Sequence, residues 1–174
     1  MCGGVNECTT AATLTLAILS SMKMKSCLPG DRRVVYPILR RIHSDGAVIT
    51  QVEQLLLDKE ADYMVKKAGK MRRSETGRGA GIVDERRTSR TAYLKNDRVI
   101  DCIGQRLATI AGMPVTHLEP PQVTSYSHKQ EYKPHYDDNR FEGQPRRVKT
   151  IFVYLDADDE LAAGLCGGAT CFRS

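Results

Sequence analysis

The stretch that decides the fold is residues 122–172, which contain four short segments rich in β-branched and aromatic residues. These segments are QVTSYS (122–127), YKPHYD (132–137), VKTIFVYL (148–155) and ATCF (169–172). Glycine, asparagine and proline residues, or the acidic run 156–160, separate them. Such segments are typical of β-strands. The sequence therefore predicts that strands build the C-terminal part of the chain.

Two helices are predicted upstream of these strands, because apolar residues there recur at helical spacing. The first helix begins near Asp58, which can cap it. The second begins at Asn96 or Asp97 and is ended by Gly112 and Pro114. The expected buried faces are Ala61, Met64, Val65 and Ala68 in the first helix, and Val99, Ile103, Leu107 and Ile110 in the second. Helices followed by strands indicate an α+β fold or a sheet sandwich with helical supports.

The chain of 174 residues is long enough for one domain. We place this domain at residues 45–174, after a leader of residues 1–44. The apolar run 11–19 is too short to span a bilayer, and no Lys or Arg precedes it as in a secretory signal. A weakly ordered leader is favoured, with a degenerate signal or anchor as the alternative. Pro37 interrupts any helix at 32–43, and a turn at 45–46 precedes a short strand at 47–50.

Positive charge is concentrated in residues 66–90, which hold nine Lys or Arg and three acidic residues. This window alone carries a formal charge of +6, whereas the whole chain carries +5. Nucleic-acid-binding surfaces usually interleave aromatic residues with the basic ones, and this window has none. A solvated or substrate-groove surface is therefore favoured over nucleic-acid binding. A basic module that binds polyanions remains the alternative.

The six cysteines are too scattered for a disulfide scaffold, and no Cys-x-x-Cys pair indicates a zinc site. Cys166 and Cys171 flank a Gly-Gly turn and could face each other across a hairpin. Free thiols are expected unless the protein is secreted.

His135 and Asp137 form the candidate metal site. They are two residues apart, and side chains alternate between the faces of an extended strand, so both are expected to project to the same side. An imidazole and a carboxylate are two members of the two-histidine, one-carboxylate triad that holds iron(II) in oxygenases.

The motifs around this pair occur in a characteristic order. Glu-x-x-Gln-Val (119–123) is followed by Tyr126, by Tyr-x-Pro-His-x-Asp (132–137), by Arg-Val-x-Thr (147–150) and by Gly-Gly-x-Thr-x-Phe (167–172). Over about residues 51–172 the sequence resembles the prolyl 4-hydroxylase family of iron(II)- and 2-oxoglutarate-dependent dioxygenases. The resemblance implies a double-stranded β-helix, a jelly-roll form, with N-terminal supporting helices and a sheet incomplete at the C-terminus. It also implies C4 hydroxylation of peptidyl proline, as in procollagen-proline 4-dioxygenases, with Fe(II), 2-oxoglutarate as cosubstrate and L-ascorbate.

The same resemblance assigns roles to individual residues. His135 and Asp137 would bind the metal, and Tyr126 and Thr170 would contact the distal carboxylate of 2-oxoglutarate. The residues implied to contact a proline-containing peptide or protein substrate are Arg87, Ser89, Glu119, Tyr132 and Arg147. Structural alternatives are a packed aromatic ring for Tyr132, an ion pair with the basic loop for Glu119 and a solvated charge run for Arg147.

The sequence departs from the family pattern in one important respect. The family's second metal histidine and its cosubstrate-binding lysine would follow Phe172, where only two residues remain. His43, His117 and His128 precede His135, so we interpret them as exposed or locally hydrogen-bonded. We expect negligible turnover by this chain as given, which would be a fragment or a non-catalytic degenerate dioxygenase module. The family suggests the endoplasmic reticulum or secretory pathway, with the cytoplasm as the alternative; we expect no membrane span.

Overall fold

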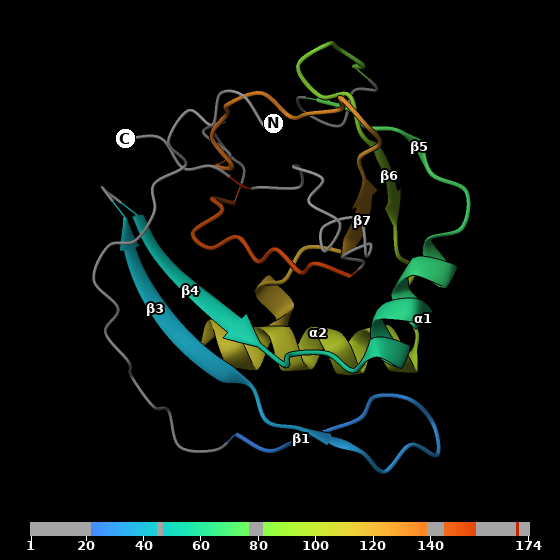
Figure 1. Cartoon of the computed structure of the whole chain (residues 1–174), viewed down its shortest axis with the longest axis vertical. Coiled ribbons are helices and arrows are strands. Elements are labelled where there is room, and N and C mark those ends of the chain that lie inside the picture. The colour runs from blue at the N-terminus through green and yellow to red at the C-terminus, as the bar shows by residue number, and fades with distance from the viewer. Residues whose placement is uncertain (1–21, 45–46, 77–81, 139–144, 156–169, 171–174) are drawn as a thin grey trace, which may run out of the picture. The chain divides into compact units, whose positions relative to one another are not determined.

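The computed structural model describes residues 22–44, 47–76, 82–138, 145–155 and 170. The chain divides into two compact units, one formed by Met1–Glu60 with Asp156–Ser174 and the other by Ala61–Leu155. The division falls inside the first helix, and each unit is described by itself. Figure 1 shows the elements in chain order.

The first unit contains two antiparallel strand pairs. Strand β1 (Met24–Lys25) pairs with β2 (Val34–Val35), and β3 (Ile38–Ser44) pairs with β4 (Ala47–Glu53). The β3–β4 hairpin is in full register, from Ile38 opposite Glu53 to Ser44 opposite Ala47. The strand predicted at 47–50 is confirmed and is longer than expected. Residues 34–35 and 38–44, on either side of Pro37, are also extended, as expected for a segment in which proline interrupts a helix.

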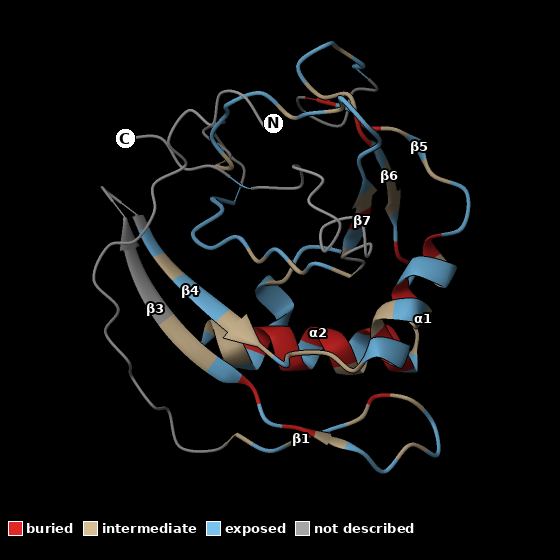
Figure 2. Ribbon diagram, viewed as in Figure 1, coloured by how far each residue is buried: buried red, intermediate tan, exposed pale blue. Residues whose placement is uncertain are grey.

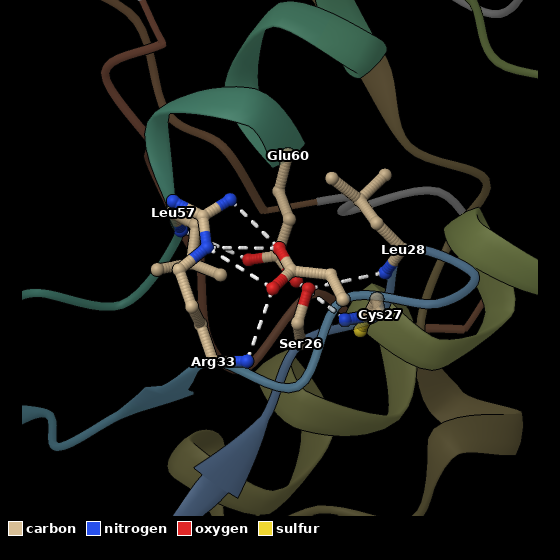
Figure 3. Close-up of polar contacts among 7 residues, drawn as sticks. Ser26, Cys27, Leu28, Arg33, Leu57 and Glu60 are labelled. Atoms are coloured by element: carbon tan, nitrogen blue, oxygen red, sulfur yellow. Dashed lines mark hydrogen bonds and ion pairs between the residues drawn. The ribbon is translucent and has the colours of Figure 1, made fainter.

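A buried carboxylate holds the turn of the β1–β2 pair to the start of helix α1 (Asp58–Ala68) (Figure 3). Glu60 is fully buried, and its two oxygens accept the backbone N–H groups of Cys27 at 2.7 Å and of Leu57 at 2.9 Å. The contact to Leu57 is one half of a capping box, in which a side chain of the first helical turn accepts the backbone N–H of the residue just before the helix. One side chain therefore satisfies two backbone donors from distant segments.

The second unit combines helices with a three-stranded antiparallel sheet in the order β5–β6–β7. The strands are β5 (Arg72–Arg73), β6 (Arg90–Tyr93) and β7 (Gln122–Ser125). The other elements are α1, α2 (Arg98–Ala111) and the short 3₁₀-helix η1 (Val115–His117). The strand predicted at 122–127 is thus confirmed in β7, and the α+β class is confirmed by this mixture of elements.

Both ends of α2 lie where the sequence predicts them. The Asp97 carboxylate accepts the backbone N–H groups of Val99 at 2.9 Å and Ile100 at 3.0 Å, as an N-cap residue does. Gly112 adopts the left-handed conformation, with φ +63°, and its N–H bonds back to the last turn. Residues with a Cβ disfavour this conformation, which explains why glycine ends the helix.

The buried face of α2 forms most of the core of this unit (Figure 2). Val99, Ile103 and Leu107 are buried, as predicted, whereas Ile110 is only half-buried. In α1 the prediction is wrong for Val65, which is 40% exposed. The other buried apolar side chains of the unit are Met64, Ala68, Leu94, Ile100, Ala108 and Val123.

Two predicted strands are not formed. Residues 132–137 make only one isolated bridge, between Tyr132 and Arg87, and residues 148–155 make no ladder with any described segment. A strand requires a neighbour that pairs with its backbone, which a strand-like composition cannot supply. Val148 and Phe152 are accordingly 72% and 58% exposed. Lys149 anchors the second segment by donating a hydrogen bond to the Ala111 carbonyl at the end of α2.

The jelly roll stays an expectation, because the described strands form sheets of two, two and three strands. The predicted strand at 169–172 lies outside the described residues except for Thr170. None of the helices in the described ranges has the length and apolar character needed to cross a membrane.

The expectation of free thiols is wrong for two cysteines. Cys27 and Cys102 are both disulfide-bonded. Scattered cysteines can pair when the fold brings them together, and their spacing in the sequence does not show this. Cys166 and Cys171 lie outside the described residues.

Candidate functional site

His135 and Asp137 lie side by side. The imidazole Nε2 is 3.1 Å from a carboxylate oxygen, Oδ1, and the two side chains are 35% and 39% exposed. Two cis ligands of an octahedral ion, each about 2.1 Å from the metal, lie about 3.0 Å apart. The separation of these two atoms matches both a shared metal ion and a direct ion pair, and solvent can reach both groups.

The hydrogen bond on the other ring nitrogen directs the imidazole toward this role. His135 Nδ1 lies 2.8 Å from the Lys133 carbonyl oxygen. A carbonyl only accepts hydrogen bonds, so Nδ1 carries the proton and donates it. Nε2 then faces the Asp137 carboxylate, and the two groups can share either a proton or a cation. A backbone partner on the second nitrogen is the usual way in which proteins orient a metal-binding histidine.

The described residues contain no group of three His, Cys, Asp or Glu side chains placed to hold one metal ion. His117 and His128 are exposed, as predicted. The assignment of His135 and Asp137 as metal ligands stays a prediction, which the geometry of the pair fits. Their alignment arises without the strand that was expected to provide it.

Tyr132 and Arg87 extend the site on one side of His135. The Tyr132 and His135 rings are stacked, with centroids 3.5 Å apart and planes inclined by 17°. The Arg87 guanidinium carbon lies 5.0 Å from the centroid of the Tyr132 ring, within the range of a cation–π interaction. The structure therefore brings together two of the predicted peptide-contacting residues and one predicted metal ligand.

Ser89, another predicted peptide contact, is fully buried. Its hydroxyl lies 2.8 Å from the Ser74 hydroxyl and accepts a hydrogen bond from Arg87 Nε at 3.4 Å. Ser89 therefore contacts Arg87 from behind, on the side away from solvent. Sequence reasoning missed Ser74, Thr91 and Thr124, which belong to the same group of hydroxyls. Only Thr124 lies on a predicted strand, so the sequence carried no signal that these hydroxyls meet.

Glu119 and Arg147 are paired with each other. Arg147 donates from Nε and Nη2 to the two Glu119 oxygens at 2.5 and 2.7 Å, and from Nη1 to the Asp137 carbonyl oxygen at 3.4 Å. The bonds from Arg147 lower the pKa of Glu119, and the same bonds raise the pKa of Arg147. An ion pair was the structural alternative for Glu119, and its partner is Arg147 rather than the basic loop. Their roles in peptide binding stay predictions.

The two predicted cosubstrate contacts belong to different units. Tyr126 follows β7, and its side chain is 47% exposed. Thr170 is exposed and belongs to the unit formed by Met1–Glu60 and Asp156–Ser174. Binding of 2-oxoglutarate by these residues stays a prediction.

Much of the basic window 66–90 is used for internal contacts. Lys67 pairs with Asp97, Arg86 pairs with Asp84 at 2.9 Å, and Arg73 donates to the Thr88 carbonyl. Within the described residues, the window's exposed basic side chains are Lys66, Lys70, Arg72, Arg86 and Arg90. The choice between a solvated or substrate-groove surface and a polyanion-binding surface stays a prediction.

Comparison with known proteins gives one distant similarity. The chain is 31% identical over 134 residues to the protein named "Probable prolyl 4-hydroxylase 10" of Arabidopsis thaliana. The alignment covers 67% of this chain and 42% of that protein, so the chain spans about two-fifths of its length. No family model matches the chain, and no solved structure matches it. The chain is thus distantly similar to a protein named as a prolyl 4-hydroxylase, which points to the dioxygenases.

Proposed function

We propose that the chain belongs to an iron(II)- and 2-oxoglutarate-dependent dioxygenase that hydroxylates peptidyl proline at C4. The observation that carries this proposal is the 3.1 Å separation of His135 Nε2 and Asp137 Oδ1. The distant similarity to a protein named as a prolyl 4-hydroxylase supports the same reaction class.

In this proposal His135 Nε2 and Asp137 Oδ1 hold the iron. When bound, iron(II) supplies the oxidation chemistry, in which 2-oxoglutarate and oxygen yield succinate, carbon dioxide and a hydroxylated peptide. The Lys133 carbonyl keeps the imidazole proton on Nδ1, so that Nε2 stays free to bind. The phenol of Tyr126 and the hydroxyl of Thr170 would donate hydrogen bonds to the distal carboxylate of 2-oxoglutarate. L-ascorbate would keep the iron reduced.

The peptide would lie along Tyr132, Arg87 and the Glu119–Arg147 pair. The Tyr132 ring lies against both Arg87 and His135, so a peptidyl proline would contact the edge of this ring. Arg147 can donate hydrogen bonds to peptide carbonyls, and the Glu119 carboxylate can accept from peptide N–H groups. Because Ser89 is buried behind Arg87, we assign it the role of holding that guanidinium rather than touching the peptide.

We further propose that the protein resides in an oxidising compartment such as the endoplasmic reticulum or the secretory pathway. The disulfide bonds of Cys27 and Cys102 support this location, because disulfides persist in oxidising compartments and are rare in the cytosol.

The proposal is tested by measuring succinate and hydroxylated product after incubation with Fe(II), 2-oxoglutarate, ascorbate and a proline-rich peptide. The assay is run with and without imidazole, which can supply a third nitrogen ligand to an incomplete triad. We expect negligible turnover without imidazole, and turnover with imidazole that His135→Ala and Asp137→Ala both abolish. His128→Ala is the matched control, because His128 is exposed and contacts none of the proposed site residues.

Turnover that survives both site substitutions would contradict the metal assignment. Absence of any turnover by the unmodified chain, with and without imidazole, would contradict the proposed function.

A further inference from the structure

Four hydroxyl groups form a continuous row across the sheet of the second unit, which we name the hydroxyl ladder: Ser74, Ser89, Thr91 and Thr124. The Ser74 hydroxyl oxygen lies 2.8 Å from the Ser89 hydroxyl oxygen and 2.5 Å from the Thr91 hydroxyl oxygen. The Thr91 hydroxyl oxygen lies 3.3 Å from the Thr124 hydroxyl oxygen. Ser74 and Ser89 are 1% and 0% exposed. Thr91 lies opposite Thr124 in the register of β6 and β7, so their side chains share one face of the sheet.

Buried hydroxyls are costly unless they are hydrogen-bonded, so a row of them requires a reason. Apolar residues at these positions would build a simpler core. The ladder therefore points to a polar group that it serves.

Arg87 is that group, because its guanidinium lies against the ladder. Nε donates to the Ser89 hydroxyl at 3.4 Å, Nη2 to the Thr91 hydroxyl at 3.3 Å and Nη1 to the Glu75 carbonyl at 3.2 Å. All three nitrogens thus have an acceptor, and the planar fork is held in one orientation. A serine or threonine that accepts from Arg87 keeps its own proton to donate further along the ladder.

The contacts continue from Arg87 to the candidate metal site. Arg87 and Tyr132 are bridge partners, the guanidinium lies over the Tyr132 ring, and that ring stacks on His135. The backbone reinforces this path, because the Lys133 N–H bonds to the Arg86 carbonyl at 2.8 Å, while the Lys133 carbonyl accepts from His135 Nδ1. A continuous path of contacts therefore links the ladder to the imidazole.

We propose that the hydroxyl ladder is a positioning device, which fixes Arg87 and, through Tyr132, the ring of His135. Ser74, Thr91 and Thr124 are positioning residues. Thr91 contacts Arg87 directly, whereas Ser74 and Thr124 act through their hydrogen bonds to Ser89 and Thr91. The contribution to catalysis depends on the proposed function, whereas the contribution to ring orientation does not.

The test removes one hydroxyl from the ladder and measures the His135 ring by proton NMR. In the native chain the stacked Tyr132 ring displaces the His135 ring-proton signals upfield, and Tyr132→Leu gives the position without stacking. In Thr91→Val the Arg87 guanidinium loses an acceptor and no longer holds the Tyr132 ring against His135. We therefore expect the His135 signals to shift most of the way toward their position in Tyr132→Leu. Thr91→Ser restores the hydroxyl and is expected to restore the native shift.

Thr109→Val is the matched control. The Thr109 hydroxyl also makes a hydrogen bond, at 2.7 Å to the Gln105 carbonyl, but it lies on the exposed side of α2 and outside the ladder. This substitution should leave the His135 signals in place. Should Thr91→Val fail to fold, Ser74→Ala takes its place, since it deletes a single oxygen and adds no bulk. Native His135 signals in a folded ladder variant would overturn the proposal.

A kinetic measurement separates this inference from the proposed function. If the chain hydroxylates a proline-rich peptide, Thr91→Val should lower kcat/KM by roughly tenfold, the effect of one lost hydrogen bond in the site. Thr91→Ser should recover most of this loss. If the chain has no turnover, the proposed function fails, while the NMR comparison still decides whether the ladder orients the ring.

Discussion

At the residue scale, the candidate site depends on short-range contacts that a two-residue spacing makes available. His135 and Asp137 were predicted to share one side on the basis of a strand, and their side chains do meet, although residues 132–137 form no strand. The contact survives because the Lys133 carbonyl, two residues earlier, orients the ring directly. Sequence spacing could therefore predict the pair but not the reason for its alignment.

Glu119→Gln is expected to change stability little. The Glu119 and Arg147 side chains are 56% and 41% exposed, and exposed ion pairs contribute about 0–1 kcal/mol. Arg147 lowers the pKa of Glu119, so the pair's contribution is present above the unfolded pKa near 4.5 and is lost as the pH falls through the lower folded value. Urea unfolding at pH 7 should show a loss of at most about 1 kcal/mol. A loss above about 2 kcal/mol would show that the pair is structural.

At the scale of elements, the helices were predictable and several strands were not. The period of apolar residues, the cap at Asp97 and the stop at Gly112 are local features, and α2 occupies the expected range. Strand formation depends on a partner that is distant in the sequence. Residues 148–155 have the composition of a strand, yet no described segment pairs with them. Composition indicated which segments could pair, and only the fold determines which ones do.

Asp97→Ala should destabilise α2 in a pH-dependent manner. Asp97 caps the helix, and its carboxylate also accepts hydrogen bonds from Lys67 and from Tyr63, the latter at 2.8 Å. The loss of an N-cap alone costs about 0.5–2 kcal/mol. The hydrogen bond from Lys67 is the main reason why the pKa of Asp97 lies well below its usual range. A carboxylate whose pKa is lowered in the folded state stabilises the protein above its unfolded pKa of about 3.9. This stabilisation is lost as the pH falls below that value.

The difference in melting temperature between native chain and Asp97→Ala should therefore be constant from pH 7 to about pH 4, and should narrow at lower pH. Thermal unfolding followed by circular dichroism measures this difference. Asp62→Ala, which removes an exposed carboxylate from α1, is the control and should change the melting temperature little. A difference that widens on acidification would contradict the role assigned to Asp97.

At the scale of the whole molecule, the sequence could not show which distant residues meet. The hydroxyl ladder joins positions 74, 89, 91 and 124, and only the pairing of β6 and β7 brings the last of these to the others. The disulfide bonds of Cys27 and Cys102 were missed for the same reason. The α+β class and the motif order were available from the sequence, because they do not depend on these long-range contacts.

Reduction of the disulfides should lower the stability of the chain. Disulfides stabilise largely by restricting the unfolded chain, typically by about 2–4 kcal/mol. Urea unfolding with a thiol reductant should therefore occur at lower urea concentration than without it. The effect should be smaller in Cys102→Ala, which already lacks the disulfide of Cys102. Identical midpoints in the presence and absence of reductant would contradict a stabilising role for these bonds.

Titration with Mn²⁺, a paramagnetic substitute for iron(II), tests most directly whether His135 and Asp137 bind one metal ion. The titration is followed through the histidine ring signals of the intact chain. We predict that Mn²⁺ broadens the His135 signals at concentrations that leave those of the exposed His117 and His128 sharp, and that Asp137→Asn abolishes this selectivity. Equal broadening of the His117, His128 and His135 signals, or broadening of His135 that persists in Asp137→Asn, would show that the two side chains do not share a metal ion.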